Sequence, residues 1–258
     1  MTENSIFRGA ATALITPLTA DGIDYESFGR LIDWQIESGI DGLVICGTSG
    51  EGSTLSDKEH REALDFAIQR ADGRVPMIAG TGSNDIAYGI DLTKFACEIG
   101  YDAVLVVTPY YNKATQNGLI KSYMATADAS SKPCILYNVP SRTGVNIEPA
   151  TYDILADHPM IQGIKEANGN IAKIVETMSI VGDRLDLYSG NDDEIVPLLS
   201  VGGSGVISVL SNVFPKETSL MCKKFFEGDT KGALELQFKY FKPVSYTHLR
   251  AHETEADL

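Results

Sequence analysis

Short apolar segments alternate with amphipathic segments along most of the chain, and this alternation limits the folds that the chain can adopt. The apolar segments carry apolar residues on both faces, as do strands of a parallel sheet that helices cover on both sides. We predict strands at residues 9–17, 42–46, 75–80, 103–108, 134–138, 161–165, 185–189 and 205–209.

The amphipathic segments between these strands have the spacing of helices. We predict helices at residues 24–38, 86–99, 118–129, 149–156, 171–181 and 193–200, and one more that a capping box at Ser56 and Glu59 opens. Eight strand–helix units favour an α/β fold that closes as a (β/α)8 TIM barrel. An open, doubly wound sheet is the alternative.

The composition excludes several classes of function. The chain has 258 residues, of which 43% are hydrophobic, and its net charge is -14 from 21 basic and 35 acidic residues. A strongly acidic chain does not favour nucleic acid or an anionic membrane as a partner. No apolar run has transmembrane length, and the first residues do not resemble a secretory signal, so we expect a cytoplasmic protein.

The cysteines and histidines give no metal-binding pattern. Cys46, Cys97, Cys134 and Cys222 lie far apart in the sequence, which predicts reduced, packed thiols. Of the four histidines, only His248 and His252 have a ligand-like spacing, and they lie in an atypical C-terminal segment. We therefore predict no metal site.

Residues with chemical potential follow the predicted strands at their C-terminal ends. In a barrel these ends meet on one face, where active sites lie. The ends carry Lys165, the glycine-rich segment with Thr48 and Ser49, the Tyr110-Tyr111 pair, and Tyr137 followed by Arg142. A primary amine, phenols, hydroxyls and a guanidinium on one rim are difficult to explain as packing alone.

Lys165 is the most informative of these residues. Desolvation at the mouth of a barrel would lower its pKa and make it a Schiff-base nucleophile. The alternative is an exposed lysine that pairs with Glu166. The segment around Thr48 and Ser49 lacks the Gly-Lys-Ser/Thr of a nucleotide-binding loop, yet its hydroxyls and amides suit a small carboxylate.

These motifs, and above all Tyr-Asn-Val-Pro-Ser-Arg-Thr-Gly at residues 137–144, resemble the dihydrodipicolinate synthase branch of the pyruvate-dependent class I aldolase family. N-acetylneuraminate lyase belongs to the same family. The similarity extends from residue 6 to about residue 243. The arginine in this segment resembles the synthases, because sialic acid lyases usually lack it.

The resemblance implies an enzyme of lysine and diaminopimelate biosynthesis, a lyase that condenses pyruvate with aspartate β-semialdehyde to 4-hydroxy-tetrahydrodipicolinate. It implies a covalent imine between lysine and pyruvate, no metal or organic cofactor, and a homotetramer. The implied roles are the imine for Lys165, proton relay for Tyr137 with Thr48 and with Tyr111 of a neighbouring subunit, pyruvate carboxylate binding for Thr48 and Ser49, binding of the second carboxylate for Arg142, and main-chain pocket contacts for Gly190 and Ile207.

The sequence leaves two other functions open. One is a different pyruvate-dependent aldolase, such as an N-acetylneuraminate or keto-sugar-acid lyase, which should keep its activity when Arg142 is replaced by Ala. The other is a catalytically silent barrel that acts as a binding protein. The complete set of Lys165, Tyr137 and Thr48 argues against a silent barrel.

The chain departs from the family pattern in three places. Ser49 stands where the family usually has a second threonine. His60, Asn84 and Tyr110 match part of the family's lysine-feedback site, but Tyr88 takes the place of its acidic residue, so we do not expect lysine to inhibit. We expect a barrel domain at residues 1–228, the start of a truncated C-terminal helical extension at 229–243, and a non-native tail at 244–258.

Overall fold

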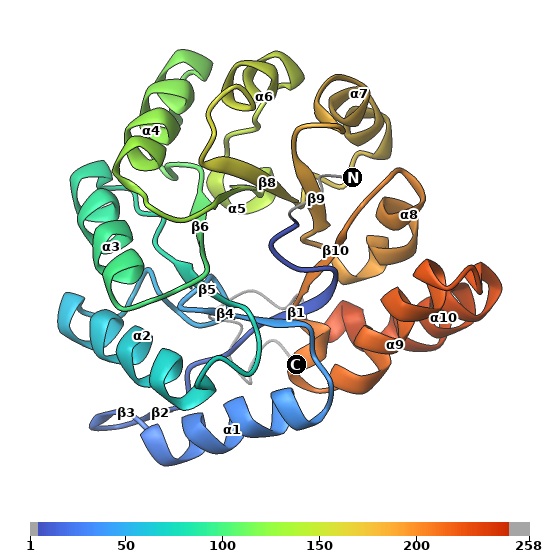
Figure 1. Cartoon of the computed structure of the whole chain (residues 1–258), viewed down its shortest axis with the longest axis horizontal. Helices are drawn as coiled ribbons and strands as arrows, with labels where there is room; N and C mark the ends of the chain where they lie inside the picture. Colours follow the sequence, from blue (N-terminus) through green and yellow to red (C-terminus); the bar gives the residue numbers. More distant parts are fainter. Residues whose placement is uncertain (1–4, 248–258) are drawn as a thin grey trace, which may run out of the picture.

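The computed structural model describes residues 5–247, and within this range eight parallel strands form a closed barrel in the order β1-β10-β9-β8-β7-β6-β5-β4 (Figure 1). Both the barrel and its alternation with helices are confirmed, and the open doubly wound alternative is wrong. The strands are β1 Gly9–Ala13, β4 Gly42–Ile45, β5 Met77–Gly80, β6 Ala103–Val107, β7 Cys134–Asn138, β8 Ile161–Glu166, β9 Asp186–Ser189 and β10 Gly205–Ser208.

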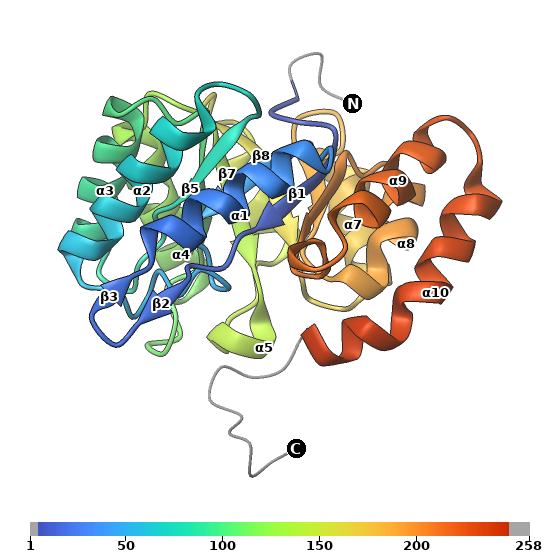
Figure 2. The ribbon, with the colours of Figure 1, turned by 90° about the horizontal axis from the view of Figure 1, so that it is seen from below.

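Helices surround the barrel, as Figures 1 and 2 show. They are α1 Tyr25–Glu37, α2 Asp57–Ala71, α3 Ile86–Glu98, α4 Gln116–Ala129, α5 Pro140–Thr143, α6 Pro149–Leu155, α7 Ile171–Val181, α8 Ile195–Ser200, α9 Pro215–Phe226 and α10 Thr230–Thr247. The predicted capping box of α2 is confirmed, because the Ser56 hydroxyl accepts the Glu59 N–H and the Glu59 carboxylate accepts the Ser56 N–H.

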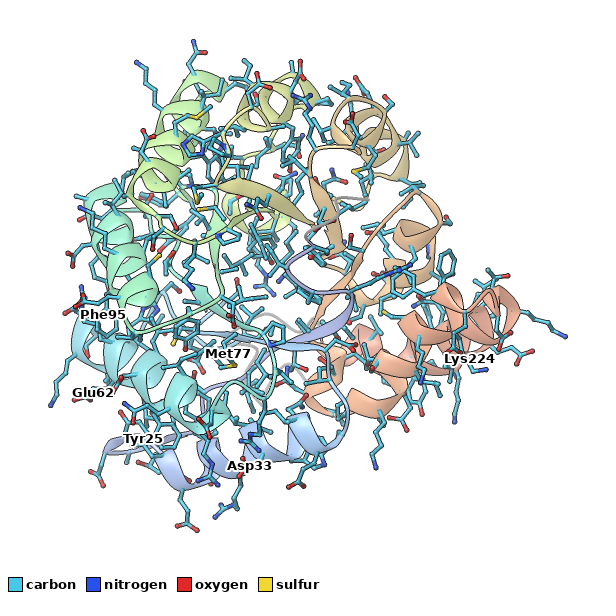
Figure 3. The ribbon with its side chains drawn as sticks, viewed as in Figure 1. Tyr25, Asp33, Glu62, Met77, Phe95 and Lys224 are labelled. Atoms are coloured by element: carbon cyan, nitrogen blue, oxygen red, sulfur yellow. The ribbon has the colours of Figure 1, made fainter. Side chains whose placement is uncertain are left out.

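The hydrophobic core has two layers. An inner cluster fills the barrel with small and β-branched side chains together with Tyr137 and Tyr188, and a larger outer cluster lies between strands and helices. Met77 of β5 belongs to the outer cluster and is fully buried (Figure 3). On the surface, Asp33 of α1 pairs with Arg70 and Arg74 at the end of α2. The inner and outer clusters together bury the strands on both faces, which explains the continuous apolar segments of the sequence.

The structure differs from the sequence-based expectation in several local features. The strand expected at residues 9–17 ends at Ala13, and a two-stranded hairpin follows, made of β2 Leu18–Thr19 and β3 Gly22–Ile23. Two short 3₁₀ helices, η1 Asp192–Glu194 and η2 Leu210–Asn212, follow β9 and β10. The segment with Arg142, for which the sequence predicted no helix, forms the short helix α5. These elements are too short to show a periodicity in the sequence.

The C-terminal region is helical as far as the structure describes it. α10 continues past Pro243 to Thr247, and Val244 is buried against Leu210 and Tyr240. The rest of the tail predicted to be non-native, residues 248–258, lies outside the described residues. Among the described residues, no helix is long and apolar enough to span a membrane.

Candidate active site

Lys165 lies on β8 with its side chain turned into the barrel. It is 4% exposed, and its register partners are Tyr137 on β7 and Tyr188 on β9. Burial lowers the pKa of Lys165 to about 7; the negative charge of Asp192 opposes this change, and the positive charge of Arg142 adds to it. The alternative of an exposed lysine paired with Glu166 is therefore wrong.

Tyr137 lies directly beside this amine. The Lys165 Nζ is 4.1 Å from the centre of the Tyr137 ring. Burial raises the pKa of Tyr137, while the charge of Arg142 and a hydrogen bond from Thr48 act in the opposite direction. A phenol in contact with both an amine and a hydroxyl can move a proton between them.

Thr48 and Ser49 lie in the tight turn between β4 and α2. The turn leaves no room for side chains at Gly50 and Gly52, where an added Cβ would lie 2.8 Å from the Leu14 carbonyl oxygen and 2.1 Å from the Cys46 carbonyl oxygen. The Thr16 hydroxyl donates to the Gly50 carbonyl at 2.8 Å and fixes the turn against the segment after β1. The fold thus presents the exposed Thr48 and the half-buried Ser49 after the end of β4.

Arg142 lies on α5, which projects from one end of the barrel (Figure 2). Its side chain is exposed, yet its charge affects the pKa of both Lys165 and Tyr137. α5 begins with Pro140 and ends at Gly144, whose φ is +69°. This proline and glycine set the length of the helix and hold the guanidinium at the mouth of the barrel.

Gly190 lies beside the Lys165 side chain, and Ile207 lies in the barrel interior. A Cβ on Gly190 would lie 3.2 Å from the Lys165 Cε, and the Gly190 N–H donates to the Glu166 carbonyl at 2.7 Å. Ile207 on β10 is fully buried and belongs to the inner cluster together with Tyr137. Gly190 therefore allows the segment after β9 to pack directly on the Lys165 side chain.

Tyr111 is not brought to this cluster within the described chain. Its side chain is 87% exposed, and its backbone has a φ of +71°, which is unusual for a bulky residue. The structure therefore brings together Lys165, Tyr137 and Thr48, while Tyr111 points away from them into solvent.

Two of the three predicted effector residues line a cavity, and the third, Asn84, stands between two lining residues, Ser83 and Asp85. His60 and Tyr110 line a cavity of about 340 Å³, together with Asp57, Asp85 and Tyr88. The Asn84 Oδ1 is buried and accepts no hydrogen bond from the described residues. Burial lowers the pKa of His60, so its ring is neutral near pH 7. The cavity lies apart from Lys165.

Three buried polar residues near the site were not predicted from the sequence. The Asn138 side chain donates to both carboxylate oxygens of Glu166, at 2.9 and 3.1 Å, and Asp192 is fully buried at the end of β9. A signal for the first pair existed, because Asn138 and Glu166 directly follow Tyr137 and Lys165 on neighbouring strands. Residues 5–247 contain no group of His, Cys, Asp and Glu side chains that could hold a metal ion.

The sequence profile of the Dihydrodipicolinate synthetase family matches residues 6–248. The chain belongs to this family. It is 48% identical over 235 residues to the 4-hydroxy-tetrahydrodipicolinate synthase of Clostridium perfringens strain 13, covering 91% of this chain and 81% of the relative. It is 51% identical over 243 residues to the synthase of Lachnoclostridium phytofermentans, covering 93% and 83%.

Solved structures of this family have the same fold. The chloride-inhibited dihydrodipicolinate synthase of Acinetobacter baumannii, complexed with pyruvate, superimposes with a TM-score of 0.92 at 40% identity. The match covers 95% of this chain and 85% of that one. The resemblance noted in the sequence is therefore confirmed, and the barrel is the fold of the dihydrodipicolinate synthetase family.

Proposed function

We propose that this chain is a 4-hydroxy-tetrahydrodipicolinate synthase, a lyase that condenses pyruvate with aspartate β-semialdehyde in lysine and diaminopimelate biosynthesis. The observation that carries the proposal is the buried Lys165, whose pKa is lowered to about 7, in contact with Tyr137. Family membership and the activity named for the relatives support the same reaction.

The proposed reaction begins with attack of the neutral Lys165 amine on the ketone carbon of pyruvate. Loss of water gives a protonated imine, whose positive charge acidifies the methyl group. Tyr137, with Thr48, carries the protons that these steps move, and the hydroxyls and amides around Ser49 hold the pyruvate carboxylate. No metal or organic cofactor takes part in these steps.

Deprotonation of the methyl group gives an enamine, which attacks the aldehyde carbon of the second substrate. Arg142 binds the carboxylate of that substrate, and Gly190 and Ile207 line the pocket. The new alkoxide takes up a proton. The amine of the second substrate then attacks the imine carbon, closes the ring and expels Lys165.

The test is reductive trapping with pyruvate and borohydride, followed by peptide mapping. The expected adduct is a reduced pyruvyl group on Lys165, with none on the Lys165→Ala variant. A folded wild-type chain without this adduct would refute the imine mechanism. Replacing Arg142 with Ala distinguishes the synthase from other aldolases, because synthase activity should fall at least tenfold while pyruvate trapping persists.

We also propose that the chain assembles as a homotetramer in which Tyr111 completes the proton relay of a neighbouring subunit. Its exposed side chain and constrained backbone support this role. Mixing the Tyr111→Phe and Lys165→Ala variants tests it, because a hybrid can contain one site with both residues intact. Activity regained on mixing is expected; no regain, with hybrids detected by native mass spectrometry, contradicts the proposal.

We propose that lysine does not inhibit the enzyme, although the cavity beside His60, Asn84 and Tyr110 has room for a small ligand. Tyr88, half-buried at the cavity wall, stands where the family's feedback site has an acidic residue, and the carboxylates that line the cavity come from Asp57 and Asp85 instead. Isothermal titration with lysine is expected to give no heat, and binding accompanied by inhibition would contradict this.

A further inference from the structure

The short helix α8 is completed by a side chain from the C-terminal helix. Its N-cap residue, Glu194, makes no side-chain capping hydrogen bond. Gln237 of α10 instead accepts the Val196 N–H at 3.1 Å and donates to the Asp192 carbonyl at 2.7 Å. Gln237 is buried, and α10 packs beside α8 and α9 (Figure 1). One side chain thus pairs with an N–H in the first turn of α8 and with a carbonyl of η1.

Asp192, whose backbone carbonyl accepts from Gln237, connects the segments that follow β9 and β10. The Asp192 carboxylate accepts hydrogen bonds from the Ser208 hydroxyl, from the Val209 N–H at 3.0 Å and from the Leu210 N–H at 2.9 Å. The segment after β9 is therefore fixed to the end of β10. Because a buried carboxylate with this many donors has little freedom, its position depends on the backbone that carries it.

The same segment packs on the nucleophile. Gly190, two residues before Asp192, lies against the Lys165 Cε, and the charge of Asp192 acts on the Lys165 amine. Arg142 of α5 opposes this charge, and Tyr137 of β7 faces Lys165 as a neutral phenol. Tyr188 of β9 is a register partner of Lys165, but its hydroxyl donates to the Phe7 carbonyl. A continuous set of contacts therefore joins α10 to Lys165.

We propose that Gln237 is a positioning residue for the imine-forming step: it fixes the segment of residues 190–192 from α10, and thereby the place of the Asp192 carboxylate relative to the Lys165 amine. The inference rests on the proposed function, because it concerns the same nucleophile. It assigns to the C-terminal helix a direct effect on the chemistry, in addition to its packing.

The test compares the pH dependence of pyruvate trapping in the full chain and in three variants. Gln237→Leu and Gln237→Met both remove the donor to the Asp192 carbonyl without adding a charge, and Met keeps the unbranched shape of Gln. Phe238→Leu, at an exposed position on α10, is the matched control. If the Asp192 carboxylate is no longer held in place, it stabilises the Lys165 ammonium less, and the pKa of Lys165 falls. The acidic limb of the rate profile should therefore move to lower pH by roughly half a unit in Gln237→Leu.

The same direction of shift is expected in Gln237→Leu and Gln237→Met, with no shift in Phe238→Leu. A thermal melt accompanies each profile, because lost packing alone would lower the melting temperature without moving the limb. The proposal is overturned if a Gln237 variant melts cooperatively and its acidic limb lies at the same pH as that of wild type or at a higher pH.

A double variant keeps the test decisive if Gln237→Leu folds poorly. Asp192→Asn removes the charge while keeping an acceptor, and its limb should also move to lower pH. Adding the neutral Gln237→Met to Asp192→Asn should then give no further shift, whereas additive shifts would refute the coupling. Failure of the proposed function is distinguishable, because wild type itself would then trap no pyruvate.

Discussion

At the scale of single residues, the proposed reaction depends on how well the Lys165 amine is shielded from water. With the usual lysine pKa of 10.5, roughly one amine in three thousand would be neutral at pH 7. With a pKa of about 7, about half are neutral and able to attack a ketone. Burial outweighs the opposing charge of Asp192, so the barrel interior, rather than a neighbouring base, keeps the amine of the proposed nucleophile neutral.

This balance predicts the pH dependence of imine formation. The amine must be neutral to attack, so the rate of pyruvate trapping at limiting pyruvate should rise with pH, with a midpoint near 7, and level off above it. Quenched-flow trapping with cyanoborohydride between pH 5.5 and 9 measures this profile. A midpoint near the usual lysine pKa would show that the site is hydrated.

At the scale of elements, each strand end is held by local contacts that also set the site. The capping box of α2 begins the helix directly after the turn that carries Thr48 and Ser49. The Asn138–Glu166 contact joins β7 and β8 at the rung next to the Tyr137–Lys165 pair. The Tyr152 hydroxyl and the Asn168 N–H also donate to Glu166.

Replacing Ser56 with Ala should destabilise the chain by about 1 kcal/mol, because the Glu59 N–H loses its capping acceptor. Urea unfolding monitored by circular dichroism measures the change. Ser53→Ala, an exposed position in the preceding turn, is the control and should leave the unfolding midpoint unchanged. Equal effects of the two substitutions would contradict a specific cap.

Replacing Glu166 with Gln should change how stability depends on pH. Burial raises the pKa of Glu166 from 4.5 to about 7, so the folded state holds a proton that the unfolded state has lost. The stabilisation from that proton is present below pH 4.5 and is lost as pH rises through about 7, by on the order of 3 kcal/mol. The melting-temperature advantage of wild type over Glu166→Gln should therefore shrink between pH 5 and pH 8; a constant difference would contradict it.

At the scale of the whole molecule, the barrel closes where β1 meets β10. Gly9 pairs with Gly205 at this seam, and a Cβ on Gly205 would lie 1.9 Å from the Gly9 carbonyl oxygen. The backbones can approach only because residue 205 has no side chain. Closure positions Ile207 and the β10 end beside Asp192, so the seam also supports the site.

Replacing Gly205 with Ala should separate the two strands and destabilise the chain by about 3 kcal/mol or more. Thermal unfolding measures the loss, and activity should fall with it because the β10 end moves. Gly118→Ala provides the control: at this position near the start of α4 the nearest atoms lie 3.5 Å from an added Cβ, so stability should hold or improve. A stable Gly205→Ala variant would show that the seam can relax.

The sequence by itself determined the fold class, because strands buried on both faces have a continuous apolar pattern that no surface segment shares. It also located Lys165, Tyr137, Thr48, Ser49 and Arg142 at strand ends, since the end of an apolar segment is visible in one dimension. The capping box of α2 was predictable for the same reason: its donors and acceptors lie three residues apart.

Only the tertiary structure decided how these residues act. The burial that lowers the pKa of Lys165 depends on strands from the whole barrel. The Asn138–Glu166 contact joins residues 28 positions apart, and the contact of Gln237 with Asp192 joins residues 45 positions apart. Such contacts leave no periodic trace, because each depends on the register of the strands and on how the helices cover them. The sequence determines which chemical groups are available. Barrel closure determines which charges lie near each group and how far the group is exposed to water.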